Sequence, residues 1–177
     1  MNGGVRLIQP GRHAAIFGFA GWSGSGKTTL VEKIIAHISA IGIDVATIKH
    51  AHHDFDADHV GKDSFRHREA GSRQVLVSSA RRSAHFIEHY DNSEPDLAQL
   101  IDQLVPAELV LVEGFKRYPI KKIEVHRPSV GKLRLHTDDD LVIALASDEL
   151  IPDCTLPLFD LEDVAGIASF ILVQTKL

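Results

Sequence analysis

The chain has 177 residues, 44% of them apolar and 24% charged, which suits one globular domain with a sizeable core. Its formal net charge of -5 argues against nucleic acid as a main partner, because domains that bind nucleic acid usually carry a basic surface. The single cysteine, Cys154, excludes a disulfide within the chain.

The N-terminal residues 1–12 lack the long apolar run and small-residue cleavage site of a signal peptide. No stretch of the chain approaches the roughly 20 apolar residues of a membrane span. We therefore expect a cytoplasmic protein without a membrane partner, whose residues 1–12 form a poorly ordered extension.

The first fifty residues predict a strand, a glycine-rich loop, a helix and a second strand. Ala14 to Ala20 is a short apolar run typical of a buried strand. A helix is predicted from about Thr28, and Asp44 to Ile48 reads as the next strand. The apolar side chains of the helix recur at the spacing of one buried stripe: Leu30, Val31, Ile34, Ile35, Ile38 and Ile41. A right-handed crossover would make the two strands a parallel pair.

The middle of the chain is more polar. Residues 51–61 are rich in histidine and aspartate and predict a functional or mobile loop. Lys62 to Ala70 reads as a short helix that Gly71 stops. Val75 to Ser78 and Ala84 to Glu88 predict two strands, as an antiparallel addition.

The third quarter predicts a helix and two strands. Ser93, Pro95 and Asp96 form a helix start, and Pro106 ends the apolar stripe that follows. Leu109–Val112 is a continuous apolar strand, whereas Lys121–His126 alternates as an edge strand would.

The last third adds a buried strand at Leu141–Ala146 and a short strand at Leu156–Phe159. Asp160 is the expected cap of a terminal helix. The order of elements predicts a three-layer α/β fold, with a mainly parallel sheet flanked by helices and some antiparallel strands.

The loop after the first strand carries the strongest motif. Gly21-Trp22-Ser23-Gly24-Ser25-Gly26-Lys27-Thr28 fits G-x-x-x-x-G-K-[ST] at every required position. Glycines let backbone N–H groups surround a phosphate, and the following helix adds its own unpaired amides. Lys27 can reach the β- and γ-phosphates, and the Thr28 hydroxyl can bind magnesium. A chance glycine-rich turn is the alternative, but an apolar strand before the motif and an amphipathic helix after it favour a P-loop. We therefore interpret residues 1–177 as a single P-loop nucleotide-binding domain.

Acidic residues at strand ends are candidates to complete the site. Glu113 follows Leu109–Val112, where proteins of this class place a carboxylate near magnesium. Asp54 lies in the loop after the second strand and is a second candidate metal ligand. The histidines of the same loop could bind a transition metal, but their irregular spacing favours a polar loop that closes over phosphates.

The next segment contains six basic residues: Lys62, Arg66, Arg68, Arg73, Arg81 and Arg82. We interpret most of them as a solvated charged face, and one or two of them remain candidate phosphate contacts. Asp148, at the end of the Leu141–Ala146 strand, is a candidate to accept hydrogen bonds from guanine. A turn or capping role before Pro152 is the alternative for Asp148.

Several segments together resemble one known family, the molybdopterin-guanine dinucleotide biosynthesis adapter proteins (MobB). The resemblance extends over nearly the whole chain, in the family's order. Its segments are Ala20–Thr29, Ile48–Asp54, Gly61–Ser64, Arg68–Gly71, Leu111–Lys116 and Ile143–Asp148. The histidine stretch and the Val-Glu-Gly-Phe-Lys strand end are the more specific parts.

The resemblance implies a GTP-binding accessory protein, with a P-loop fold related to dethiobiotin synthetase. It implies a homodimer with weak Mg²⁺-dependent GTP hydrolysis, which assists the molybdenum cofactor guanylyltransferase. Direct binding of molybdopterin is left open. The matching motif implies that the phosphates and magnesium are held by the residues from Gly24 to Thr29. Lys27 and Glu113 would be the catalytic residues, and Asp148 a base contact.

Two features of the resemblance are less complete. Lys116 and His50–Asp54 match family segments without a settled role. Related proteins often carry an extra lysine early in the phosphate loop, where this chain has Trp22, so catalysis by such a lysine does not carry over. A P-loop small-molecule kinase is the alternative function, with arginines such as Arg66 and Arg68 in a closing lid.

Overall fold

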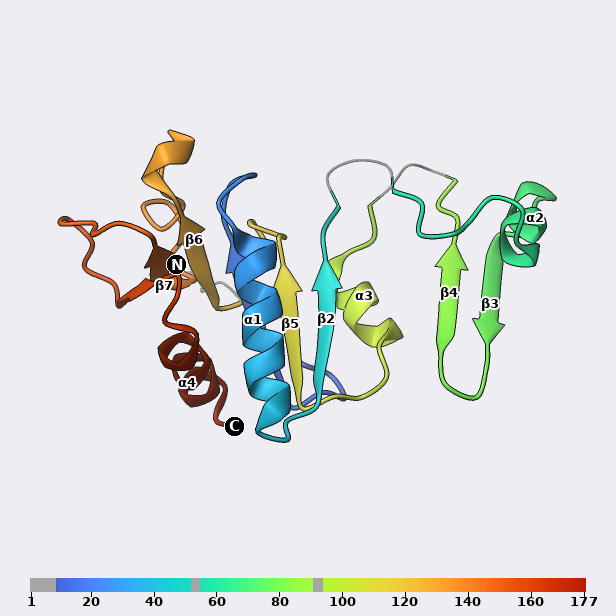
Figure 1. Ribbon diagram of the computed structural model, residues 1–177, viewed down its shortest axis with the longest axis horizontal. Coiled ribbons are helices and arrows are strands. Elements are labelled where there is room, and N and C mark those ends of the chain that lie inside the picture. The colour runs from blue at the N-terminus through green and yellow to red at the C-terminus, as the bar shows by residue number, and fades with distance from the viewer. Residues whose placement is uncertain (1–8, 52–54, 91–93) are drawn as a thin grey trace, which may run out of the picture. The chain divides into compact units, whose positions relative to one another are not determined.

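The computed structural model describes residues 9–51, 55–90 and 94–177 (Figure 1). The chain divides into two compact units, one of Met1–His50 with Leu97–Leu177 and one of Ala51–Asp96. Most of the extension expected over residues 1–12 lies outside the described residues, and the single domain over residues 1–177 stays a prediction. None of the helices in the described ranges has the length and apolar character needed to cross a bilayer.

The first unit is built on a six-stranded sheet in which every pair of neighbours is parallel. In sheet order the strands are β2 (Val45–Lys49), β5 (Leu109–Glu113), β1 (Ala15–Ala20), β6 (Lys122–His126), β7 (Val142–Ser147) and β8 (Leu158–Asp160). Because all strands run the same way, their carboxyl ends share one edge of the sheet. The loops at that edge are therefore close in space.

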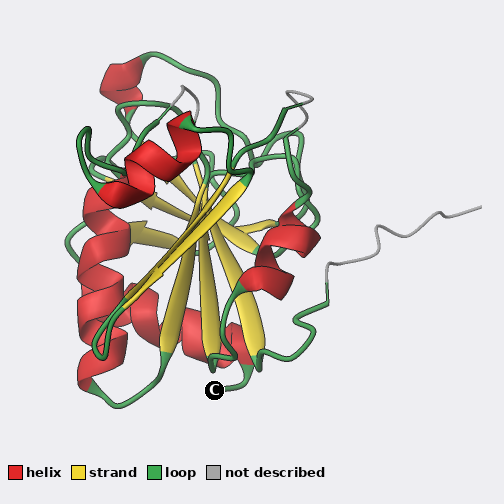
Figure 2. Cartoon of the chain, turned by 90° about the vertical axis from the view of Figure 1, so that its right-hand side faces the viewer, coloured by secondary structure: helices red, strands yellow, loops and turns green. Residues whose placement is uncertain are grey.

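Helices cover both faces of this sheet, as Figure 2 shows. The helices α1 (Lys27–Ala40) and α4 (Val164–Thr175) pack on one face, where Phe17, Ile34 and Ile171 belong to one apolar cluster. The short α3 (Leu97–Gln103) lies on the other face, with a second cluster around Val110 and Val112. The three-layer α/β fold predicted from the sequence is confirmed.

The strand β6 corrects one expectation. Its alternating pattern predicted an edge strand, but it lies inside the sheet between β1 and β7, with all five residues buried. Polar residues of the alternation bind partners within the protein instead of solvent. Lys122 Nζ donates to Asp139 Oδ2 at 2.8 Å and to the Tyr118 carbonyl at 2.9 Å. Glu124 accepts hydrogen bonds from the backbone N–H groups of Leu135 and His136 at 2.7 and 3.1 Å.

Two helix starts also differ from the expected positions. Asp163, not Asp160, is the N-cap of α4, and its carboxylate accepts the Gly166 N–H at 2.9 Å. Asp160 ends β8 and accepts the Glu162 N–H, which forms the turn before the helix. The helix α3 begins at Leu97, after the predicted Pro95–Asp96 start, and Ser93 lies outside the described residues.

The second unit contains α2 (Asp63–Glu69) and the hairpin of β3 (Gln74–Ser78) and β4 (Ser83–Ile87). The two strands are antiparallel, as predicted, and form a sheet of their own. Arg68 on α2 forms ion pairs with Asp56, Asp58 and Glu88 at 2.9, 3.2 and 2.7 Å. Hydrogen bonding to Arg68 lowers the pKa of Asp56. This arginine therefore has a structural role inside the unit.

The 3₁₀ turn η1 (Pro128–Val130) follows β6 in the first unit.

Candidate nucleotide-binding site

The P-loop joins the carboxyl end of β1 to the first turn of α1. Two of its glycines are required by geometry. Gly21 has a φ of 152°, and a Cβ there would clash with the Val125 carbonyl oxygen. Gly26 has a φ of 90° and is the N-cap of α1 in the left-handed conformation. Neither a capping side chain nor an acidic residue of the first turn occupies the start of α1. Its amides and positive dipole end are therefore oriented toward the loop, as in an anion-binding site.

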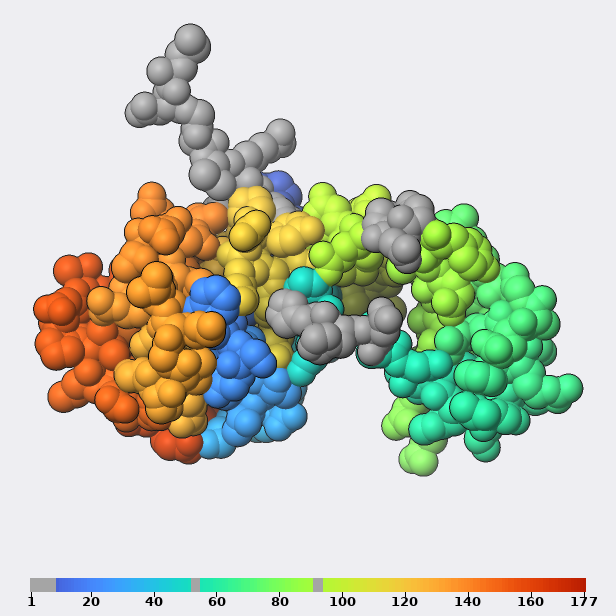
Figure 3. Space-filling view, turned by 90° about the horizontal axis from the view of Figure 1, so that it is seen from above, coloured from blue at the N-terminus to red at the C-terminus, as the bar shows by residue number. Residues whose placement is uncertain are grey.

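The other predicted loop residues lie where the motif places them. Ser23, Gly24, Thr28 and Thr29 are exposed, while Ser25 is buried with its hydroxyl unpaired among the described residues. The loop lies at the carboxyl edge of the sheet, the side viewed in Figure 3, where its blue atoms reach the surface between yellow and orange segments.

Lys27 points back across the loop. Its ammonium donates to the Trp22 carbonyl at 2.8 Å. Burial lowers the pKa of Lys27, which the nearby Glu113 carboxylate opposes, and the positive charges of Lys116 and Lys49 lower it further. Three ammonium groups thus act on one small region, an arrangement that a polyanion would stabilise.

Glu113 lies beside Thr28 at the end of β5. The Thr28 hydroxyl donates to Glu113 Oε1 at 2.7 Å. The parallel register also places Lys49, the last residue of β2, opposite Glu113. Lys49 Nζ lies 3.0 Å from Thr28 Oγ1 and 3.3 Å from Glu113 Oε1. A hydroxyl and a carboxylate oxygen therefore already hold one cation, and such hard oxygen donors are those that Mg²⁺ prefers. The residues present fit a magnesium ion.

The turn after β5 is tightly built. Gly114 has a φ of 95°, and a Cβ there would lie 2.7 Å from the Cβ of His50. The next residue, Phe115, has a φ of 46°, is buried, and stacks on the His50 ring with centroids 4.6 Å apart. These contacts fix the direction in which Lys116 leaves the sheet. Its Nζ lies 3.9 Å from the centroid of the Trp22 ring.

Asp148 is close to the P-loop through one arginine. It follows β7, and its Oδ2 accepts a hydrogen bond from Arg127 Nη1 at 2.7 Å. Arg127 Nε donates to the Ser25 carbonyl at 3.1 Å, within the P-loop. The structure therefore connects the predicted base contact to the phosphate loop, and recognition of guanine by Asp148 stays a prediction.

The second predicted metal ligand, Asp54, lies outside the described residues, as do His52 and His53. In residues 9–51, 55–90 and 94–177, no group of three or more His, Cys, Asp or Glu side chains is placed to hold a metal ion.

Lys49 and Arg127 are site residues to which the sequence reasoning assigned no role. Lys49 ends a strand, as Glu113 does, so the strand-end argument applied to Glu113 was also available for it. Arg127 directly follows β6, whose place beside β1 and β7 was not predicted. No sequence signal connects Arg127 to Ser25, because the contact spans 102 residues.

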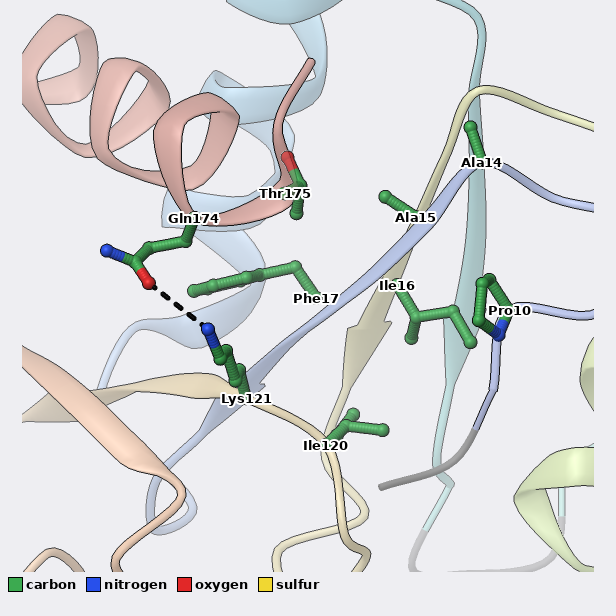
Figure 4. A pocket seen from close by; sticks show the side chains of 9 residues that line it. All are labelled: Pro10, Ala14, Ala15, Ile16, Phe17, Ile120, Lys121, Gln174 and Thr175. Atoms are coloured by element: carbon green, nitrogen blue, oxygen red, sulfur yellow. Dashed lines mark hydrogen bonds between the residues drawn. The ribbon is translucent and has the colours of Figure 1, made fainter. Parts of the chain in front are cut away.

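A separate pocket opens at the other end of β1 (Figure 4). Pro10, the first half of β1, Ile120, Lys121 and the last turn of α4 line it. Lys121 Nζ donates to Gln174 Oε1 at 3.4 Å across its mouth. The P-loop follows the opposite end of the strand, so this pocket is not the phosphate site.

Comparisons with known proteins agree with this geometry. A family model, "Molybdopterin guanine dinucleotide synthesis protein B" (MobB), matches residues 16–148. The chain is similar to two molybdopterin-guanine dinucleotide biosynthesis adapter proteins. It is 42% identical to the one from Escherichia coli, over 89% of this chain and 91% of the relative. It is 43% identical to the one from Haemophilus influenzae, over 94% and 92%.

Among solved structures, the chain resembles Bacillus subtilis MobB with a TM-score of 0.72 and 26% identity, covering 90% of this chain and 96% of that one. A second structure, of molybdopterin-guanine biosynthesis protein B, gives a TM-score of 0.69 at 25% identity, covering 90% and 99%. The family match covers both the P-loop and Asp148. The chain therefore belongs to the MobB family of molybdopterin-guanine dinucleotide biosynthesis adapter proteins.

Proposed function

We propose that this protein is a GTP-binding adapter in the biosynthesis of molybdopterin guanine dinucleotide, with slow Mg²⁺-dependent GTP hydrolysis at most. The observation that carries the proposal is the P-loop with Thr28 and Glu113 side by side at 2.7 Å. The names of the relatives supply the pathway, and the geometry supports the nucleotide.

The proposed binding mode follows from the contacts. The amides of residues 24–29 and Lys27 hold the β- and γ-phosphates, and Lys49 adds a second ammonium at the end of β2. Thr28 and Glu113 would hold Mg²⁺, which when bound neutralises charge on the phosphate oxygens. Lys49 then leaves these two oxygens and turns to the phosphates, because both cations compete for one pair of ligands.

Slow hydrolysis is expected from the same contacts. In the proposed binding mode the Glu113 carboxylate would hold Mg²⁺ beside Thr28, so it would not orient the attacking water. Arg127, which contacts the P-loop, is held by Asp148 and the Ser25 carbonyl. Fast phosphoryl transfer needs a group that orients the nucleophile and a cation that meets the transition-state charge. With these two residues engaged, binding is the main activity.

The proposed partner is the molybdenum cofactor guanylyltransferase, and the proposed assembly is a cytoplasmic homodimer. Both rest on family membership. Direct binding of molybdopterin by this protein is an alternative way in which it would assist that enzyme. Co-purification from cells that make the cofactor tests the partner: recovery of the nucleotidyltransferase supports the proposal, and its absence contradicts it.

The nucleotide proposal is tested by the affinities for GTP and ATP with Mg²⁺ in the parent protein, in Lys27→Ala and in Lys33→Ala. Lys33 lies on the same helix and pairs with Glu162 away from the loop, so it is the matched control. We expect Lys27→Ala to weaken GTP binding by at least about tenfold, the scale of a lost charge-assisted contact. Lys33→Ala should leave it unchanged. Equal affinity in all three proteins would remove the proposal, and fast acceptor-dependent release of ADP from ATP would favour a small-molecule kinase.

A further inference from the structure

Trp22 occupies a fixed position inside the P-loop. Its indole Nε1 donates to the Leu133 carbonyl at 2.7 Å, in the segment after β6. Its own carbonyl accepts the Lys27 ammonium at 2.8 Å. Trp22 is therefore held through its backbone by Lys27 and through its ring by the segment after β6.

Lys116 meets the face of that ring. The distance of 3.9 Å from its Nζ to the ring centroid is that of a direct cation–π contact. The backbone of Lys116 is held from the other side, because the buried Lys122 ammonium donates to its carbonyl at 3.1 Å. The side chain is thus positioned at both ends.

Lys116 is partly buried and lies in a positively charged part of the site. Burial lowers the pKa of Lys116, and so does the positive charge of Arg117. Lys116 and Lys27 both contact Trp22, Lys116 at the face of the ring and Lys27 at the backbone carbonyl. Both ammonium groups would therefore stabilise an anion bound in the P-loop.

We infer that Lys116, held on the Trp22 ring, is a second phosphate-contacting lysine of the P-loop and binds the terminal phosphate of a nucleoside triphosphate. Lys116 comes from the turn after β5, so it brings a positive charge to the P-loop from another element. This inference rests on the proposed function, since it takes the ligand of the P-loop to be a nucleotide.

The test compares GTP and GDP, both with Mg²⁺, in the parent, Lys116→Met, Lys116→Arg and Lys132→Met. Lys132 is the matched control, because its Nζ is 6.0 Å from the same ring centroid and its side chain is exposed. Trp22 is the single tryptophan of the chain, so its fluorescence reports binding directly. Lys116→Met should weaken the binding of GTP by about tenfold and the binding of GDP by less than about threefold. This is the selectivity expected when one contact to the terminal phosphate is lost. Lys116→Arg should retain most of the GTP affinity, and Lys132→Met should change it by less than about twofold.

Calorimetric titration of Trp22→Leu and Trp22→Phe tests the role of the ring. Phenylalanine keeps a face for the ammonium, whereas leucine does not, so only Trp22→Leu should lose GTP affinity as Lys116→Met does. The inference is overturned if Lys116→Met leaves GTP binding unchanged, weakens GTP and GDP equally, or matches Lys132→Met. In any of these cases, a loss of GTP affinity in Lys27→Ala would still support the proposed function. A parent protein that binds no GTP would overturn both.

Discussion

Glu113 Oε1 is shared by two donors, the Thr28 hydroxyl at 2.7 Å and the Lys49 ammonium at 3.3 Å. The three groups come from β5, from α1 and from β2, and they meet because parallel strands end at one edge of the sheet. Glu113 is the proposed magnesium ligand of this group. Its position directly opposite Lys49 brings the carboxylate to the first turn of α1.

We expect Glu113→Gln to weaken the dependence of GTP affinity on Mg²⁺. The amide keeps the size of the side chain but loses the negative charge that a divalent cation needs, so the apparent magnesium affinity should fall by about tenfold or more. The measurement is a titration of Mg²⁺ at fixed GTP, followed by Trp22 fluorescence.

Glu108→Gln is the control for this prediction. Glu108 immediately precedes β5, at the opposite end of the strand, where it accepts the Asp44 N–H at 2.9 Å. Its replacement should leave the magnesium titration unchanged. An unaltered titration in Glu113→Gln would show that other groups bind the ion.

Among the elements, the strands and α1 were predicted within one or two residues, because each is a local pattern. Ala15–Ala20 and Leu109–Glu113 are apolar runs of strand length, and α1 carries a stripe at helical spacing. The position of β6 could not be predicted in this way. Its alternation is that of a strand exposed on one side, and the partners of its polar residues come from the segments before and after it, such as Tyr118 and Asp139. The role of Arg127 could not be predicted for the same reason, because both of its contacts are distant in sequence.

The buried pairing of β6 leads to a prediction about stability. The Lys122 side chain is 2% exposed and has three oxygen partners, the carboxylate of Asp139 and the carbonyls of Lys116 and Tyr118. Lys122→Met would remove one donor from each of these acceptors and leave the Asp139 carboxylate without its cation, so we expect the free energy of unfolding to fall by about 3 kcal/mol. Urea denaturation followed by circular dichroism measures it.

Lys33→Met provides the comparison, since the Lys33 side chain is 39% exposed and pairs with an exposed Glu162. Such a surface pair contributes less than about 1 kcal/mol. Equal losses in the two variants would mean that the contacts of Lys122 add nothing beyond those of a surface ion pair.

At the scale of the whole molecule, the second unit has little core of its own. Its only sheet among the described residues is the β3–β4 hairpin, and a lone two-stranded hairpin is marginally stable in water. Leu76 and Val77 on β3 are 68% and 45% exposed, and Phe55 and Val60 in the preceding segment are 77% and 84% exposed. Several large apolar side chains exposed on so small a unit are typical of a protein that another protein covers.

We expect the proposed homodimer to cover Leu76 on β3, which Leu76→Lys tests directly. The lysine keeps a long side chain but places a charge where an apolar contact is expected, so it should favour the monomer. Light scattering after size-exclusion chromatography should give a mass near twice the 19.4 kDa of the chain for the parent, and a mass near the monomer value for Leu76→Lys. The control is Leu150→Lys in the first unit, where the leucine is 86% exposed and the dimer should persist. A parent that elutes as a monomer contradicts the homodimer, and a dimeric Leu76→Lys places the interface elsewhere.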